Sequence, residues 1–209
     1  MNSRLTNILL TTILVIGGAL LVIQMEKLKK AKENVPAPVV ETTKVATALD
    51  TIFSRKSVRE YTNAPVEKEK LLTLVKAGMA APTARNLQPW SFIIIDNPKL
   101  LRPHAEVWGL NMLKQAMAAI IVCGKKDELF WQQDCSAATE NILLAAEYLG
   151  LGAVWCAGFP REDRVEIFTK NFNIPEDYLP LSLVAIGYPA GETPVKDKYK
   201  EEKIHWNRW

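Results

Sequence analysis

Three cations and a hydroxyl occur within five consecutive residues, 55–59 (RKSVR). A guanidinium fork, an ammonium group and a hydroxyl are donors suited to a phosphate, and each charge-assisted hydrogen bond contributes about 1.5–3 kcal/mol. Two further cations, Lys196 and Lys198, lie in the tail, where alternating charge is typical of a solvated segment. A basic pentapeptide alone is more often solvated surface than a binding site, so 55–59 is a candidate anion site only.

A second candidate segment, 81–90 (APTARNLQPW), joins a predicted helix to a predicted strand. Its two prolines restrict the backbone. Asn86 and Gln88 each carry an amide donor and an amide acceptor, which suits a heterocycle edge with alternating N–H and C=O groups, such as a flavin pyrimidine. Amides that only stabilise the loop are the alternative interpretation.

A third candidate segment, 155–160 (WCAGFP), ends a predicted strand before a predicted helix. Gly158 would let the backbone approach a flat ligand closely, and backbone N–H groups of such a turn would meet a ring nitrogen. An ordinary turn between a strand and a helix explains the same residues equally well.

The cysteines, the histidines and the absence of several known motifs argue against disulfide, metal and hydrolytic sites. The three cysteines are odd in number and lack a C-x-x-C spacing, so we interpret them as small apolar residues in a reduced compartment. With only two histidines, we predict no metal site. The chain has no G-x-S-x-G, P-loop, H-E-x-x-H or G-x-G-x-x-G motif. Any NAD(P)H would therefore be a visiting substrate.

The elements that position these segments follow from hydrophobic periodicity. We predict helices over 43–53, 66–80, 98–115, 134–149 and 161–172, and strands over 90–96, 117–123, 152–157 and 181–187. Asp134 is the expected N-cap of the fourth helix, whose small polar surface places it at the centre of the fold or in a large interface. Short strands alternating with helices indicate an α/β or α+β sheet between helices.

The two ends of the chain differ from the rest. Residues 1–33 carry the whole net charge of +3, so the remainder is neutral and gives no basic footprint for nucleic acid. Residues 8–23 are uncharged, and as a helix they would be roughly 24 Å long. The hydrocarbon core of a bilayer is about 30 Å thick, so the segment is borderline for spanning a membrane. The tail 192–209 ends with two tryptophans that need burial, on a partner subunit or on their own domain.

We therefore divide the chain into an anchor or signal segment (1–33), a linker (34–42) and a domain (43–209). Four lysines follow the apolar run, and the positive-inside rule then predicts a membrane-anchored protein with its catalytic domain in the cytoplasm. Export by a cleaved signal peptide is the alternative, although no small-residue cleavage site follows the run. A buried core helix is the least favoured interpretation.

Taken in this order, the segments resemble the nitroreductase family of FMN enzymes. The first of the corresponding motifs is R-[RH]-S-x-[RK] at 55–59, with Lys56 in place of the Arg or His of the second position. The others are P-[ST]-x-x-N-x-Q-P-W at 82–90, D-x-x-x-A-x-x-N-x-L-L-A-A-x-x-L-G-L-G-x-x-W at 134–155, and G-Y-P, K-x-[RK] and H-[YW]-N-R-W between 187 and 209. The resemblance runs from about residue 45 to the end. It implies an α+β homodimer with a central mixed or antiparallel sheet, flanking helices, a domain-wrapping C-terminal tail, and FMN at each end of the interface.

The resemblance assigns the phosphate end of FMN to two segments. Arg55, Lys56 and Ser57 would bind the phosphate and the ribityl chain, and Lys196 and Lys198 would complete the phosphate site. Lys198 stands where arginine is common in the family, which reduces bidentate grip.

The resemblance also assigns the flavin ring. Arg59 would lie near N1 and O2. Asn86 would bond the pyrimidine edge, with Gln88 alongside it. Ala157 and Gly158 would present backbone N–H groups to N5 or O4.

One part of the site is expected from the second subunit. The resemblance implies that Pro82 and Thr83 reach the flavin of the other subunit. Arg85 is bulky where small residues are frequent in the family, so the shape of the cavity there is expected to differ.

The implied activity is transfer of electron pairs from NAD(P)H through FMN to a nitroaromatic, quinone or similar small acceptor, in a ping-pong scheme. The flavin N5 would do the chemistry, so no side chain is assigned as catalytic, and Arg59 would tune the flavin. Three alternatives stay open: a flavoenzyme of the same fold with other chemistry (reductive dehalogenase, dehydrogenase or flavin-fragmenting oxygenase), a non-enzymatic flavin-binding protein, and a membrane-tethered interaction module. Iodotyrosine deiodinases also carry an anchor, but their substrate-lid pattern is not clear here.

Overall fold

The computed structural model describes residues 24–27 and 46–209, and the chain divides into units 1–45 and 46–209. In the first unit, a single helical turn at 24–27 is described. The predicted membrane segment 8–23 and the linker 34–42 lie outside the described residues. Of the helices that are described, none is long and apolar enough to cross a membrane.

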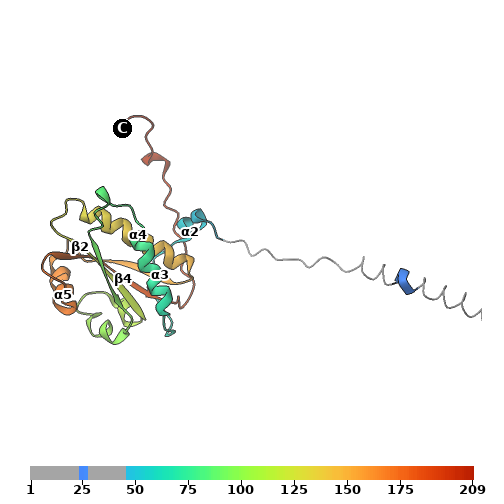
Figure 1. The fold of residues 1–209 in the computed structure, drawn as a ribbon, viewed down its shortest axis with the longest axis horizontal. Helices are drawn as coiled ribbons and strands as arrows, with labels where there is room; N and C mark the ends of the chain where they lie inside the picture. The colour runs from blue at the N-terminus through green and yellow to red at the C-terminus, as the bar shows by residue number, and fades with distance from the viewer. Residues whose placement is uncertain (1–23, 28–45) are drawn as a thin grey trace, which may run out of the picture. The chain divides into compact units, whose positions relative to one another are not determined.

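A four-stranded antiparallel sheet in the order β1-β2-β4-β3 forms the centre of the second unit (Figure 1). Its strands are β1 (Trp90–Ile95), β2 (Ala118–Lys125), β3 (Gly152–Ala157) and β4 (Tyr178–Gly187). The central strands β2 and β4 are apolar along most of their length because both of their faces are buried. The α+β fold with a sheet between helices is confirmed, and the sheet is antiparallel throughout.

Helices and turns cover both faces of this sheet. Helices α3 (Lys68–Met79) and α4 (Trp131–Tyr148) pack on one face, in front of the sheet in Figure 1. Helix α5 (Glu162–Phe172) and the segment 98–116 cover the other face. A hydrogen bond of 2.9 Å between the buried hydroxyls of Thr139 and Ser182 ties α4 to β4. Helix α4 is therefore central, as its small polar surface predicts.

The predicted helix over 98–115 is wrong. The segment forms three separate 3-10 turns, at Pro98–Leu100, Arg102–His104 and Asn111–Lys114. Two prolines and Gly109, whose φ is +63°, interrupt regular α-helical hydrogen bonding. Apolar residues at helical spacing still reach the core, which explains why the periodicity misleads.

Two helix starts also differ from the prediction. Helix α4 begins at Trp131, so Asp134 lies inside its first turns and is not the N-cap. Helix α2 (Ala48–Ser54) begins after Thr47, whose side chain accepts a hydrogen bond from Asp50 N–H. Thr47 and Asp50 form a capping box, and this local signal marks the start better than the apolar spacing does.

The segment 55–59 runs along the open edge of β3. Val58 N–H donates to Ala153 O at 3.0 Å, and Ser57 forms a parallel bridge with Ala153. The close approach depends on Gly152, because a Cβ there would lie 2.6 Å from Val58 Cγ1. Tyr61 then donates its buried hydroxyl to Val58 O at 2.7 Å. This edge contact fixes the backbone of the basic segment.

The C-terminal tail follows β4 back past the same segment. Tyr61 pairs with Pro189 in an antiparallel bridge, and Ala190 N–H donates to Glu60 O at 3.0 Å. Beyond this anchor the tail leaves the domain (Figure 1), and Trp206 is 85% exposed. The tail of a single chain therefore buries neither Trp206 nor Trp209 on its own domain.

We predict that Gly152→Ala destabilises the fold by about 1–3 kcal/mol, because the new methyl group displaces Val58 from the strand edge. Urea denaturation of the full chain measures this free energy of unfolding. Gly191→Ala is the matched control, since a Cβ at Gly191 would have no atom within 4 Å. Equal stability of the two variants would contradict the edge contact.

Candidate functional site

A basic cleft of about 340 Å³ forms where segment 55–59 meets the beginning of the tail. Its lining residues are Arg55, Lys56, Ser57, Arg59, Thr193, Pro194, Lys196 and Lys198. The structure thus brings together six of the predicted site residues, from segments more than 130 positions apart. The strand-edge contact and the anchor at Ala190 explain how the two segments meet.

Two cations of the basic cleft are held by carboxylates of α4. Arg55 Nε lies 3.1 Å from Glu140 Oε1, and Lys56 Nζ lies 2.8 Å from Glu147 Oε1. The two glutamates are seven residues apart, so they lie on one face of the helix, two turns from each other. Five cations against two carboxylates leave the cleft a net charge of +3. That charge favours a dianionic ligand.

Four residues of this site are not among those predicted from the sequence: Thr193, Pro194, Glu140 and Glu147. The glutamates had a readable signal, because two acids seven residues apart on a largely apolar helix share a face. Nothing local in the sequence marks Thr193 or Pro194, since their position depends on the path of the tail.

The end of β3 adds a backbone donor on the same strand edge. Ala157 pairs with Ser182 in the β3–β4 ladder, while the next residue, Gly158, donates its N–H to Leu181 O at 2.8 Å. Alternation along an antiparallel ladder then directs the Ala157 N–H and C=O to the open side. Arg164 Nη1 donates to this Ala157 O at 3.0 Å.

The sequence suggests that Gly158 allows a flat ligand to approach the backbone, whereas the structure shows that it allows close packing against β4. A Cβ there would lie 2.3 Å from Pro180 O, so the close approach is to β4. Its N–H is already engaged within the sheet. Of the two backbone donors expected at this turn, only that of Ala157 faces the open edge.

The loop 82–88 lies apart from the basic cleft, and none of its residues lines the cleft. The Ala84 N–H contacts both carboxylate oxygens of Asp134, each at 3.2 Å, at the start of α4. Lys56 is held at Glu147, thirteen residues further along the same helix. Those anchor points are roughly 20 Å apart along the axis. Predicted site residues Pro82, Thr83, Asn86 and Gln88 are therefore not brought to the cleft of their own chain.

The two amides of this loop are oriented by each other. Gln88 Nε2 donates to Asn86 Oδ1 at 2.9 Å, and both side chains are exposed. The bond leaves the Asn86 amino group as a donor and the Gln88 carbonyl as an acceptor. A donor beside an acceptor complements a heterocycle edge that alternates C=O and N–H.

The three cysteines are buried and are not nucleophiles. Burial raises the pKa of Cys156, directly before Ala157, to about 11, and those of Cys123 and Cys135 to about 12. Thiolates are therefore scarce at neutral pH. Within residues 24–27 and 46–209, no group of three His, Cys, Asp or Glu residues could hold a metal ion.

Comparison with known proteins places these features in a family. The model of the nitroreductase family matches residues 52–122 and 102–188. A protein of Methanothermobacter thermautotrophicus named "Putative NADH dehydrogenase/NAD(P)H nitroreductase" is 42% identical over 166 residues, which cover 77% of this chain and 87% of the relative.

Two solved structures show the same fold. A Bacteroides thetaiotaomicron protein with that same name is 49% identical, with a TM-score of 0.75 and coverage of 78% of this chain and 98% of its own. An FMN-dependent nitroreductase from Clostridium difficile is 28% identical, with a TM-score of 0.72 and coverage of 77% and 99%.

Proposed function

The chain belongs to the nitroreductase family, and from that premise we propose that it binds FMN and passes electron pairs from NAD(P)H to a small oxidised acceptor. The observation that carries the proposal is the basic cleft beside the open edge of β3. Its ligand class, a phosphate monoester next to a flat ring, is the chemistry of FMN. The names of similar proteins support the cofactor and the electron donor.

The donors of the basic cleft fit the phosphate. Glu140 and Glu147 orient Arg55 and Lys56 before a ligand binds. Binding to their remaining N–H groups therefore costs less side-chain conformational entropy. Ser57 follows Lys56 directly in the sequence and lines the same cleft, so its hydroxyl is a further donor. Lys196 and Lys198 add positive charge from the tail, the second segment that lines the cleft.

The ring would lie along the edge of β3, where the Ala157 N–H offers a donor to N5 or O4. Bound FMN would supply the two-electron chemistry between NAD(P)H and the acceptor, and its reduced form would carry negative charge near N1. The Arg59 guanidinium, which bonds Ser57 O at 3.3 Å, would stabilise that charge. NAD(P)H and the electron acceptor would bind in turn to the same exposed face of the flavin ring, which is a ping-pong scheme.

A second copy of the chain would complete the site. In a two-fold dimer with antiparallel α4 helices, the start of one helix lies opposite the end of the other. The loop 82–88 of one subunit would then meet the basic cleft of its partner. This arrangement would bring Pro82, Thr83, Asn86 and Gln88 to the flavin.

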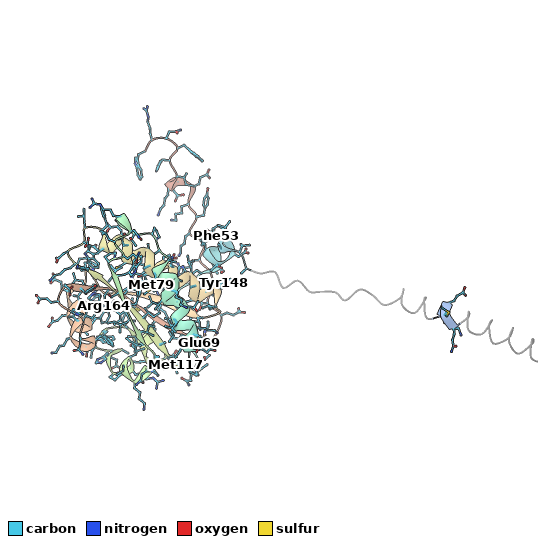
Figure 2. All side chains as sticks on the ribbon, in the orientation of Figure 1. Phe53, Glu69, Met79, Met117, Tyr148 and Arg164 are labelled. Carbon is cyan, nitrogen blue, oxygen red and sulfur yellow. The ribbon has the colours of Figure 1, made fainter. Side chains whose placement is uncertain are left out.

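Apolar surface beside α4 supports such a contact. Leu49 and Phe53 of α2 and Tyr148 of α4 are exposed in the single chain, and Figure 2 shows Phe53 and Tyr148 on the same side of the domain. Exposed apolar patches of this kind mark interaction surfaces. The exposed Trp206 and Trp209 of the tail would also find burial on the partner.

Anchoring by residues 8–23, with the domain in the cytoplasm, is retained as part of the proposal. Its support is the uncharged run followed by four lysines. Carbonate extraction of membranes would leave an anchored chain in the pellet, whereas an exported and cleaved chain would be shorter and soluble.

The test of the proposed activity is the visible spectrum of the full chain, loaded with FMN, under anaerobic conditions. We expect flavin absorbance that bleaches when NADH or NADPH is added and returns when a quinone or nitroaromatic acceptor follows. Flavin bands that do not bleach would indicate a flavin-binding protein or another donor. A chain that takes up no FMN would contradict the proposal.

We also predict that Arg59→Ala slows reduction of bound FMN about tenfold or more while changing FMN affinity by less than about threefold, because its charge acts on the reduced ring. Stopped-flow reduction and fluorescence titration measure the two effects. Glu60→Ala, at the neighbouring exposed position outside the cleft, is the matched control. Equal losses in rate and affinity would contradict this role.

A further inference from the structure

We propose that Asp134 is a positioning residue, whose buried carboxylate holds loop 82–88 in the conformation that presents Asn86 and Gln88 to the flavin ring. The proposal rests on the proposed function, which assigns this loop to FMN. It adds a residue that acts from inside α4, through the loop, without contact to the cofactor.

The carboxylate of Asp134 is used outside its own helix. Asp134 is only 6% exposed, and both of its carboxylate oxygens accept a hydrogen bond from Ala84 N–H at 3.2 Å. A buried carboxylate requires such compensation, and the positive end of α4 supplies more. Asp134 is not the N-cap of this helix, because Phe130 occupies that position.

The loop that Asp134 holds has an unfavourable backbone. Arg85, Asn86 and Gln88 have φ values of +53°, +57° and +49°, in the left-handed region that residues other than glycine rarely adopt. Such conformations persist only where surrounding contacts determine them, and they cluster at ligand-binding sites. Ala84 directly precedes the first of the three, so its bond to Asp134 fixes the entrance to the left-handed stretch.

The other hydrogen bonds of the loop lie within it or join its end to β2. Within it, Asn86 N–H donates to Thr83 O at 3.3 Å and Leu87 N–H donates to Ala84 O at 3.1 Å. Gln88 N–H donates to Thr83 Oγ1 at 3.2 Å, and Lys125 N–H donates to Pro89 O at 2.9 Å. Between the loop and the start of α4 there is a hollow of about 50 Å³, lined in part by Arg85, Leu87 and Phe130. Because packing there is incomplete, the Asp134 bond is the main link from the entrance to the helix.

The experiment compares Asp134→Ala with Asp134→Asn, which keeps an oxygen for the Ala84 N–H. Thr139→Val is the matched control, because it removes a buried hydrogen bond from the same helix to β4 and not to the loop. Affinity is measured by fluorescence titration of each full chain with FMN and with riboflavin, which lacks the phosphate. Amide hydrogen exchange at residues 84–88 reports the loop directly.

We expect Asp134→Ala to weaken FMN and riboflavin by the same factor, about tenfold, the change that loss of one hydrogen bond to a charged group predicts. Exchange at 84–88 should accelerate. Asp134→Asn should restore most of the affinity, and Thr139→Val should lower the melting temperature without changing either affinity. Unchanged affinity in Asp134→Ala, or weakening of FMN alone, would overturn the positioning role.

Ala84→Pro tests the same bond from the loop if Asp134→Ala does not fold. Proline removes the N–H, fits the first position of the 3-10 turn, and is compatible with Thr83 at φ −134° and ψ 149°. The same parallel loss for both flavins is expected, and wild-type affinity would overturn the role. A wild-type chain that binds neither flavin would overturn the proposed function and this inference together, whereas binding that is insensitive to both variants would overturn the inference alone.

Discussion

The hydrogen bond from Val58 N–H to Ala153 O is the contact on which the candidate site depends. It lays the basic segment 55–59 along the free edge of β3, beside the backbone donor of Ala157. Gly152 permits the approach, and the Tyr61–Pro189 bridge brings the tail lysines to the same place. An edge strand normally leaves its polar backbone open to further pairing. Here part of that edge is paired with the segment that carries the basic side chains of the cleft.

Helix α4 sets the positions of the other parts. Its buried face packs on the sheet, while Asp134, Glu140 and Glu147 contact the loop 82–88, Arg55 and Lys56 in turn. One helix thus determines the spacing between loop 82–88, which is proposed to bind the flavin ring, and the basic residues that are proposed to bind the phosphate. Because the two sets of anchors lie toward opposite ends of the helix, a second antiparallel copy is the simplest way to unite them. The same helix would then serve both as core and as interface.

Local patterns predicted much of the fold from the sequence, and the misses have physical causes. Strand β3 and helices α3 and α5 were predicted to within about two residues, because their periodicity agrees with their burial. The segment 98–115 failed because apolar spacing cannot distinguish an α-helix from successive 3-10 turns. The hydrogen bond from Gly158 N–H to Leu181 O depends on the register of β3 against β4, which the local sequence does not indicate. The cation cluster could be predicted from motif order, but its partners Glu140 and Glu147 required the packed helix.

A crystal structure of the full chain with FMN would test the proposed dimeric flavin site most directly. We expect the phosphate within hydrogen-bond distance of Arg55, Ser57 and the tail lysines, with the ring along β3. We also expect the Asn86 and Gln88 amides of a second subunit at the pyrimidine edge. A phosphate bound elsewhere, or a flavin held within one subunit and without a partner loop, would contradict the proposed site.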